Sequence, residues 1–151
     1  MIEANDVDAE FVAECANTLG FLVKDWGFSH PEIDIRSNVV SVTFYKKEIA
    51  IECILDKREG DISVKVVKLQ KGKKPDVYRK NAKGNLVREY LTQLLIRKGI
   101  RDISFPDPGD LQQLARRRAN YRRELFGYAR MLQRYGEDIL EGSAKVFGEQ
   151  R

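Results

Sequence analysis

The sequence predicts an α+β fold: an N-terminal helix, an antiparallel meander of three or four strands, and C-terminal helices that pack on one face of the sheet. Three observations predict it. An apolar stripe with helical spacing opens the chain, three alternating segments with short links follow, and a second helical stripe closes it. The chain has 151 residues, a length typical of one domain. We therefore expect residues 1–151 to form a single α+β domain.

The first predicted element is a helix that begins near Asn5 or Asp6, either of which can cap it. Its apolar residues recur every three or four positions, as on one helix face: Phe11, Cys15, Leu19, Leu22 and Trp26. Gly27 and Pro31 predict its end. Cys15 and Cys53 both lie in apolar patterns, so we interpret them as small core residues of a reducing compartment, with a disulfide as the alternative.

Strand segments with alternating apolar residues follow at 39–45, 49–55 and 62–69, and residues 32–35 can add a fourth strand at the edge. The links between them are too short for a parallel crossover, so the strands are predicted to be antiparallel neighbours. Alternation places Glu52 on the face opposite Ile51 and Cys53, and it turns Lys65 outward as well. We therefore expect both charged side chains to be solvated.

A polar, basic loop at residues 70–85 separates the strands from the C-terminal helices. Its candidate anion-binding residues are Lys71, Lys73, Lys74, Tyr78, Arg79, Lys80 and Lys83. Tyr78 could stack on a base. After the loop, Asn85 is placed to cap a helix over 86–98, and Gly99 is placed to end it.

The last helix is predicted by apolar residues at intervals of three and four from Leu111 to Ile139. Gly136 marks a position where this helix can break. The stripe fits either a helix pair that covers the sheet or one long helix that pairs with a second copy, which allows a homodimer. Four arginines lie on the side opposite the stripe: Arg116, Arg123, Arg130 and Arg134. We expect their guanidinium groups to face water, as a solvated face or as a contact surface.

The net charge of +4 conceals a strong asymmetry along the chain. Residues 1–64 carry 6 Lys/Arg and 13 Asp/Glu, residues 65–101 carry 12 and 2, and residues 102–151 carry 9 and 8. The three net charges are thus −7, +10 and +1. Opposite charges of this size can attract each other within one fold, or they can steer a charged partner.

Motifs for catalysis, metals or cofactors are missing from the sequence. The single histidine, His30, lies in a turn, and no Cys or His pair has the spacing of zinc ligands. Residues 72–74 lack the further glycine and hydroxyl of a phosphate-binding loop. The strand carboxylates lack the glutamate–spacer–lysine pair used by metal-dependent nucleases. We therefore expect a non-enzymatic protein without a cofactor.

The sequence also gives an expectation about location. The first ten residues are acidic and contain no apolar run, which excludes a signal or transit peptide. No stretch approaches the roughly 20 apolar residues that cross a bilayer. We predict a cytoplasmic protein that has no membrane partner.

Three stretches carry a resemblance to a group of known proteins: LGFLVKDWGF at 19–28, the charged turn at 55–60, and YARMLQRYGEDILEG at 128–142. Together with the order of elements, they resemble small uncharacterised bacterial α+β proteins, some of which are immunity proteins that neutralise a toxin by binding it. The resemblance implies a protein partner but no functional residues. Four acidic residues of the first helix could face a basic toxin: Asp6, Asp8, Glu10 and Glu14.

The sequence therefore favours a non-enzymatic binding protein. Its expected partner is another protein, such as a toxin. The alternative is nucleic acid or another polyanion, bound by the basic region 65–101 and by the arginine row of the last helix.

Overall fold

A computed structural model describes residues 6–76, 80, 83–100 and 117–147, without the side chains of residue 6 and residues 117–121. The N-terminal elements are α1 (Asp6–Thr18) and α2 (Phe21–Trp26). The strands are β1 (Glu32–Ile35), β2 (Val39–Lys46), β3 (Ile49–Asp56), β4 (Asp61–Lys68) and β5 (Arg88–Tyr90). The remaining elements are α3 (Leu91–Arg97), α4 (Arg117–Tyr135), α5 (Glu137–Leu140) and the 3₁₀ helix η2 (Ala144–Phe147). The predicted α+β class is confirmed.

The strands form one antiparallel sheet in the order β1-β2-β3-β4-β5. The expected edge strand is present as β1, which pairs with β2. Alternation along β2, β3 and β4 directs one set of apolar side chains to a common face, because Val42, Cys53 and Val64 stand opposite one another in register. All three are buried, so this is the core face of the sheet.

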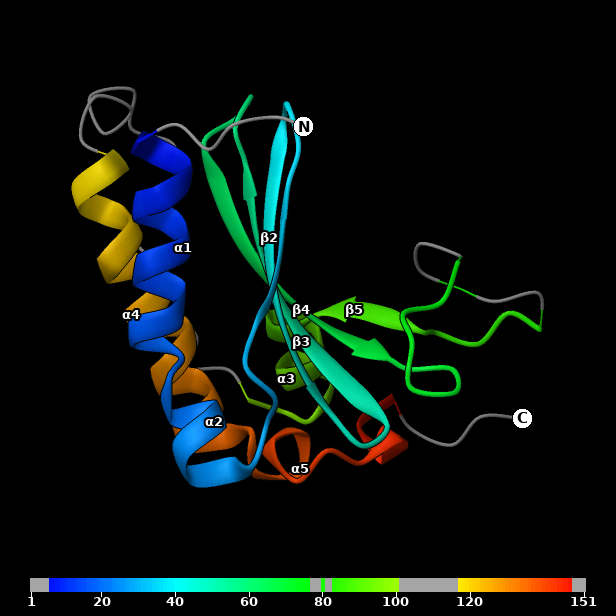
Figure 1. Ribbon diagram of the computed structural model, residues 1–151. Coiled ribbons are helices and arrows are strands. Elements are labelled where there is room, and N and C mark those ends of the chain that lie inside the picture. The colour runs from blue at the N-terminus through cyan, green and yellow to red at the C-terminus, as the bar shows by residue number, and fades with distance from the viewer. Residues whose placement is uncertain (1–5, 77–79, 81–82, 101–116, 148–151) are drawn as a thin grey trace.

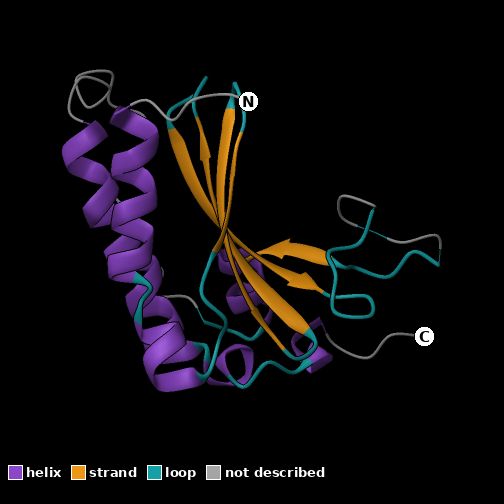
Figure 2. Cartoon of the chain, viewed as in Figure 1, coloured by secondary structure: helices purple, strands orange, loops and turns teal. Residues whose placement is uncertain are grey.

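Helices α1 and α4 lie side by side next to the sheet (Figure 2). Buried residues of both helices, such as Phe11 and Leu125, belong to the same hydrophobic cluster as the core face. The hydroxyl of Tyr128 on α4 donates a hydrogen bond to the carbonyl of Ile62 on β4 at 3.3 Å. The described part of the α4 apolar stripe is thus covered within one chain by α1 and the sheet, so a homodimer would need a surface other than this part.

The sequence left open whether the last helix breaks near Gly136, and the structure has this break, because α4 ends at Tyr135 and α5 begins at Glu137. A methyl group on Gly136 would lie only 2.8 Å from the carbonyl oxygen of Leu132. A larger residue could therefore enter only if the backbone shifted. Leu111 and the rest of residues 101–116 lie outside the described residues, so the length of the helix before Arg117 remains a prediction.

Two predicted helices differ from the structure. The first is divided near Gly20 into α1 and α2, although Gly27 ends α2 in the left-handed conformation (φ +75°), as expected of a helix-ending glycine. The helix predicted over 86–98 begins only at Leu91, because Arg88–Tyr90 pairs with β4 as strand β5. Asn85 therefore does not cap it, and the residue that precedes α3 is Tyr90 in an extended conformation. Among the described helices, none is long and apolar enough to cross a membrane.

Candidate functional site

Helix α4 presents an exposed face that is rich in arginine. Its sequence holds six arginines and one glutamate. Leu125 and Leu132 turn into the core, whereas the opposite side chains are exposed. We call this surface the α4 arginine face and define it by Arg123, Phe126, Arg130 and Arg134. The arginines span eleven positions, or about 16 Å along the helix axis.

Phe126 lies between Arg123 and Arg130 along α4, at one side of the row of arginines, and 56% of its surface is exposed. The guanidinium carbon of Arg130 lies 5.9 Å from the centre of its ring, and that of Arg134 lies 5.3 Å from the centre of the Tyr135 ring. Both distances are in the range of cation–π contacts. The sequence analysis missed Phe126, although a signal was present: it is an apolar residue at helical spacing from arginines on the polar side.

The guanidinium charges of the α4 arginine face have no counter-charge within the described part of the chain. No described carboxylate lies within 4.0 Å of the guanidinium nitrogens of Arg123, Arg130 or Arg134. All three side chains are exposed. This confirms the expectation that they face water, while Arg116 lies outside the described residues. The positive charge of this face is therefore available to an external partner.

Two acidic residues of α1 form ion pairs within the chain, whereas the sequence suggested that they face a partner. Asp8 is fully buried, and the ammonium of Lys57 lies 3.2 Å from its carboxylate oxygens. Glu14 accepts hydrogen bonds from Arg122 of α4, the shortest at 3.0 Å, and it raises the pKa of that guanidinium above the ordinary arginine value. Of the four acids proposed to meet a basic toxin, Glu10 is exposed, while the side chain of Asp6 is not described.

The basic loop is divided between exposed and inward lysines. Lys71, Lys73, Lys80 and Lys83 are exposed, whereas Tyr78 and Arg79 lie outside the described residues. Lys71 and Gly72 both have positive φ (51° and 78°), and Gln70 and Lys73 exchange backbone hydrogen bonds of 2.8 and 3.0 Å. Two central residues with positive φ define a tight hairpin turn, which projects Lys71 into solvent.

Lys74 turns back onto the face of the sheet opposite the core. Its ammonium donates to Glu52 Oε2 at 2.7 Å and to Thr43 Oγ1 at 2.8 Å. The guanidinium of Arg88 approaches the other oxygen of Glu52 at 3.3 Å. Glu52 is only 6% exposed, so the expectation of a solvated carboxylate was wrong. The physical reason is that the start of the loop folds over this carboxylate and supplies a cation.

Lys65 is buried on the same face, which also corrects the sequence prediction. Register explains its position, because Thr43, Glu52, Lys65 and Tyr90 stand opposite one another on four adjacent strands. The ammonium of Lys65 lies 4.9 Å from the centre of the Tyr90 ring. Together with Lys74 and Arg88, the buried side chains of Thr43, Glu52 and Lys65 form a polar layer that attaches the loop to the sheet, with the exposed Tyr90 at its edge.

A shallow pocket of about 520 Å³ lies beside this layer and is lined by Glu32, Tyr45, Gly72, Lys73 and Lys74. The Tyr45 hydroxyl donates to Glu32 Oε1 at 3.0 Å. Partial burial and the neighbouring Glu32 carboxylate together raise the Tyr45 pKa to about 12. The tyrosine therefore stays protonated at neutral pH and does not act as a base.

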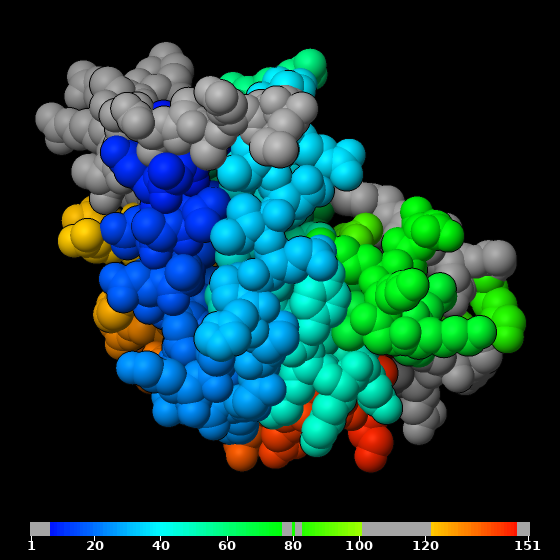
Figure 3. Space-filling model, viewed as in Figure 1, coloured from blue at the N-terminus to red at the C-terminus, as the bar shows by residue number. Residues whose placement is uncertain are grey.

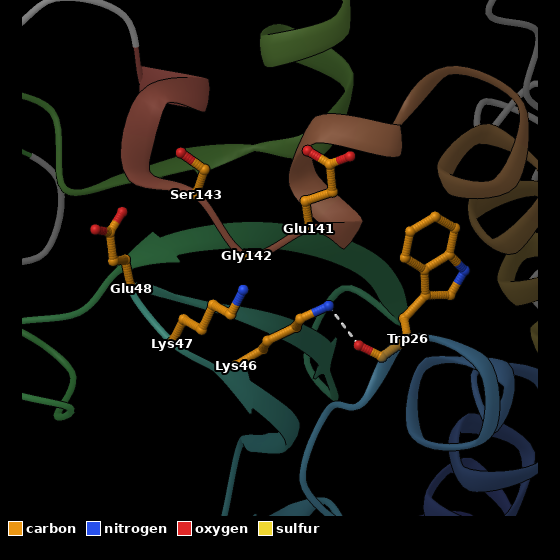
Figure 4. Close-up of a pocket in the computed structure, with 7 residues that line it drawn as sticks. All are labelled: Trp26, Lys46, Lys47, Glu48, Glu141, Gly142 and Ser143. Atoms are coloured by element: carbon orange, nitrogen blue, oxygen red, sulfur yellow. Dashed lines mark hydrogen bonds between the residues drawn. The ribbon is translucent and has the colours of Figure 1, made fainter.

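A second pocket, of about 470 Å³, lies between the β2–β3 turn and the segment that follows α5 (Figure 4). Lys46 crosses it to donate to the backbone carbonyls of Trp26 and Leu140, the latter at 2.8 Å. Burial and the neighbouring Lys47 lower the Lys46 pKa. These carbonyls belong to the C-terminal ends of α2 and α5, which attract positive charge. Lys46 therefore ties two helix ends to the sheet.

The described residues do not form a metal centre. They contain no group of three or more His, Cys, Asp or Glu residues placed to hold a metal ion. His30 is exposed. The ionised groups of the polar layer are held in ion pairs that fix the loop, and both pockets are open and bordered by charges of both signs. The α4 arginine face and the exposed loop lysines are the strongest candidate binding surfaces.

The two basic surfaces lie on opposite sides of the molecule. In Figure 1, α4 lies beyond one side of the sheet and the described loop residues project from the other. The space-filling view shows the loop in green at one edge and α4 in yellow and orange at the other (Figure 3). The sequence analysis grouped both as contacts for a nucleic acid or another polyanion, and the structure places them on different sides of the molecule. Comparison with known proteins adds nothing to this geometry, since no protein-family model, curated protein or solved structure matches the chain.

Proposed function

We propose that this chain is a non-enzymatic binding protein that docks an acidic surface of another protein onto the α4 arginine face. The observation that carries the proposal is Phe126, which is 56% exposed and lies between Arg123 and Arg130 along α4. Exposure of an aromatic ring to water is unfavourable. Aromatic residues and arginine are enriched in the hot spots of protein interfaces, so an exposed phenylalanine beside arginines is typical of such a site.

The same observation favours a protein over duplex nucleic acid as the partner on α4. The phosphates of a duplex are attracted by clustered positive charge but gain little from a phenyl ring, because stacking on the ring requires the unpaired bases of a single strand. A protein pocket that accepts Phe126 can exclude water around the ring, while carboxylates at the rim of that pocket pair with Arg123 and Arg130. The partner we infer therefore has an apolar pocket bordered by Asp or Glu.

Toxin neutralisation is the specific form of this function that the resemblance to immunity proteins implies. The charge layout changes the expected partner surface. Asp8 and Glu14 are engaged inside the chain, so a basic toxin surface would find few free carboxylates on α1. The free charge is on α4, and we infer that a toxin bound here would offer an acidic surface, with electrostatic steering that weakens as salt is added.

The proposal is tested by affinity capture from a nuclease-treated lysate of the source organism, followed by purification of the captured protein and titration. The double variant Phe126→Ala/Arg130→Glu should weaken binding at least about 100-fold, as expected for the loss of a hot spot. The matched control is Lys71→Glu/Lys73→Glu, which changes exposed charge on the opposite side of the molecule. Equal affinity of wild type and the α4 variant would refute the proposal.

A second candidate function, polyanion binding, is supported by the exposed loop lysines Lys71, Lys73, Lys80 and Lys83. Its test is fluorescence anisotropy with labelled single-stranded and duplex oligonucleotides of about 20 nucleotides at low salt. Binding through the loop should be lost in Lys71→Glu/Lys73→Glu, retained in Phe126→Ala, and weakened steeply as salt rises. Absence of binding at low ionic strength would eliminate this candidate.

A further inference from the structure

The two cysteines of the chain meet inside the hydrophobic core. Cys15 lies on α1 and Cys53 on β3, 38 positions apart in the sequence, and their sulfur atoms are 3.3 Å apart. Both are fully buried and both are free thiols. The Cys15 thiol donates a hydrogen bond to the sulfur of Cys53. The pair therefore bridges the interface between a helix and the centre of the sheet.

The geometry points to a modification site: we propose that Cys15 and Cys53 form an intramolecular disulfide when the protein meets a low-molecular-weight disulfide. A disulfide requires sulfur atoms about 2.05 Å apart, so the two sulfurs must approach by little more than 1 Å. Neither sulfur lies near a third metal ligand, because no cluster of three His, Cys, Asp or Glu residues exists among the described residues. Metal binding is therefore not the role of this pair.

The reaction balances with glutathione disulfide as the oxidant. One cysteine thiolate attacks a sulfur of glutathione disulfide, the S–S bond breaks, and one glutathione thiolate leaves. The thiolate of the second cysteine then attacks the resulting mixed disulfide and expels the second glutathione. The pair loses two electrons and two protons, and one glutathione disulfide becomes two glutathione molecules.

Burial makes this oxidation slow in the native state. It raises the pKa of the Cys15 thiol well above its ordinary value, and the hydrogen bond to Cys53 acts in the same direction. A thiol held in the protonated form is a poor nucleophile. Oxidation must therefore follow a local opening of α1, or it must occur while the chain folds. Once formed, the bond would hold α1 on β3 and close off that opening.

The experiment compares the reduced chain with a chain refolded from guanidinium chloride in a glutathione redox buffer, and with a native chain incubated with excess glutathione disulfide. The expected product is a monomer lighter by two hydrogen atoms, with a peptide cross-link between Cys15 and Cys53. Its Tm should rise by about 10 °C relative to the reduced protein. Amide hydrogens of α1 should also exchange more slowly.

Cys15→Ala and Cys53→Ala serve as controls, and their Tm should not depend on the redox buffer. The mass of the wild-type protein can be measured without any variant, so the proposal can still be tested if either substitution impairs folding. The proposal is overturned if both treatments leave the dithiol mass, or if the only products are stable glutathione adducts or disulfide-linked dimers.

Discussion

The polar layer beneath the basic loop and the arginine face of α4 use positive charge in opposite ways. Lys74 and Arg88 turn inward, where both approach the buried carboxylate of Glu52. Arg123 and Arg130 turn outward, and no described carboxylate pairs with them. The comparison teaches that local charge density does not decide whether a cation is free. What decides is whether the fold places a carboxylate where the cation can reach it.

The two arrangements also differ in energetic consequence. Removing one member of a buried ion cluster leaves an uncompensated charge in a poorly solvated place, which costs about 3 kcal/mol or more. Removing an exposed arginine changes stability by a few tenths of a kcal/mol. The polar layer should therefore respond to mutation as part of the fold, and the α4 arginine face should respond only in binding.

The largest expected effect is that of Glu52→Ala, which leaves Lys74 and Arg88 without their shared carboxylate. We expect the free energy of unfolding, measured by urea denaturation, to fall by about 3 kcal/mol. Asp76→Ala is the matched control, because Asp76 is an exposed acid in the basic loop that covers Glu52, and its effect should stay within about 0.5 kcal/mol. Equal losses of unfolding free energy in the two variants would contradict the distinction between buried, paired charges and exposed charges.

A smaller effect is expected from Lys74→Met, with the adjacent Lys73→Met as its control. The Lys74 hydrogen bonds to Glu52 and Thr43 are lost, but Arg88 still pairs with Glu52, so the free energy of unfolding should fall by only about 2 kcal/mol. Lys73 is exposed, and the same change there should be close to neutral. Chemical denaturation of both variants under one set of conditions tests the prediction, which fails if Lys73→Met is the more destabilising of the two.

Tyr45 tests the region of the polar layer through the pH dependence of stability. It lies beside Lys74 in the pocket, and burial and Glu32 raise its pKa to about 12. A tyrosine whose folded pKa lies above the unfolded value of about 10 stabilises the fold fully below pH 10 and loses that contribution as the pH rises from 10 to 12. Phenolate absorbance should therefore show a late-titrating tyrosine that disappears in Tyr45→Phe. Burial also raises the pKa of Tyr128, so that tyrosine should titrate late in both proteins. Ionisation of all the other tyrosines near pH 10 would contradict this account.

The smallest expected effect on stability is that of Arg123→Ala/Arg130→Ala on α4. Because both side chains are exposed, the free energy of unfolding should change by less than about 0.5 kcal/mol. Retained stability together with lost partner binding would assign this surface to recognition. A loss of 2 kcal/mol or more would instead show that these arginines stabilise the fold, as the polar layer does.

The sequence predicted those parts of the fold that depend on local patterns. Alternation located β1 to β4, and the glycine at 136 marked the break after α4. Strand β5 was missed because it is three residues long, and it exists only because it pairs with β4. Burial of Glu52 was missed for a similar reason, since it depends on a loop that returns more than twenty positions later to cover it.

For the candidate site, helical spacing was enough to place Arg123, Arg130 and Arg134 on one exposed face. Spacing alone did not show which charges are already paired. Lys74 looked like its neighbour Lys73 in sequence, and Glu14 looked like a free carboxylate. The pairing partners come from distant elements, so they become visible only after the chain is folded.

The contact between α1 and α4 has a consequence for the time at which this protein can finish folding. Glu14 and Arg122 are 108 positions apart, and α1 also packs against α4 along its length. A ribosome that adds about 5–20 residues per second needs at least several seconds to supply the second helix after the first has emerged. During that interval the apolar side of the leading helix lacks its partner, and the nascent chain is exposed to aggregation and to chaperones.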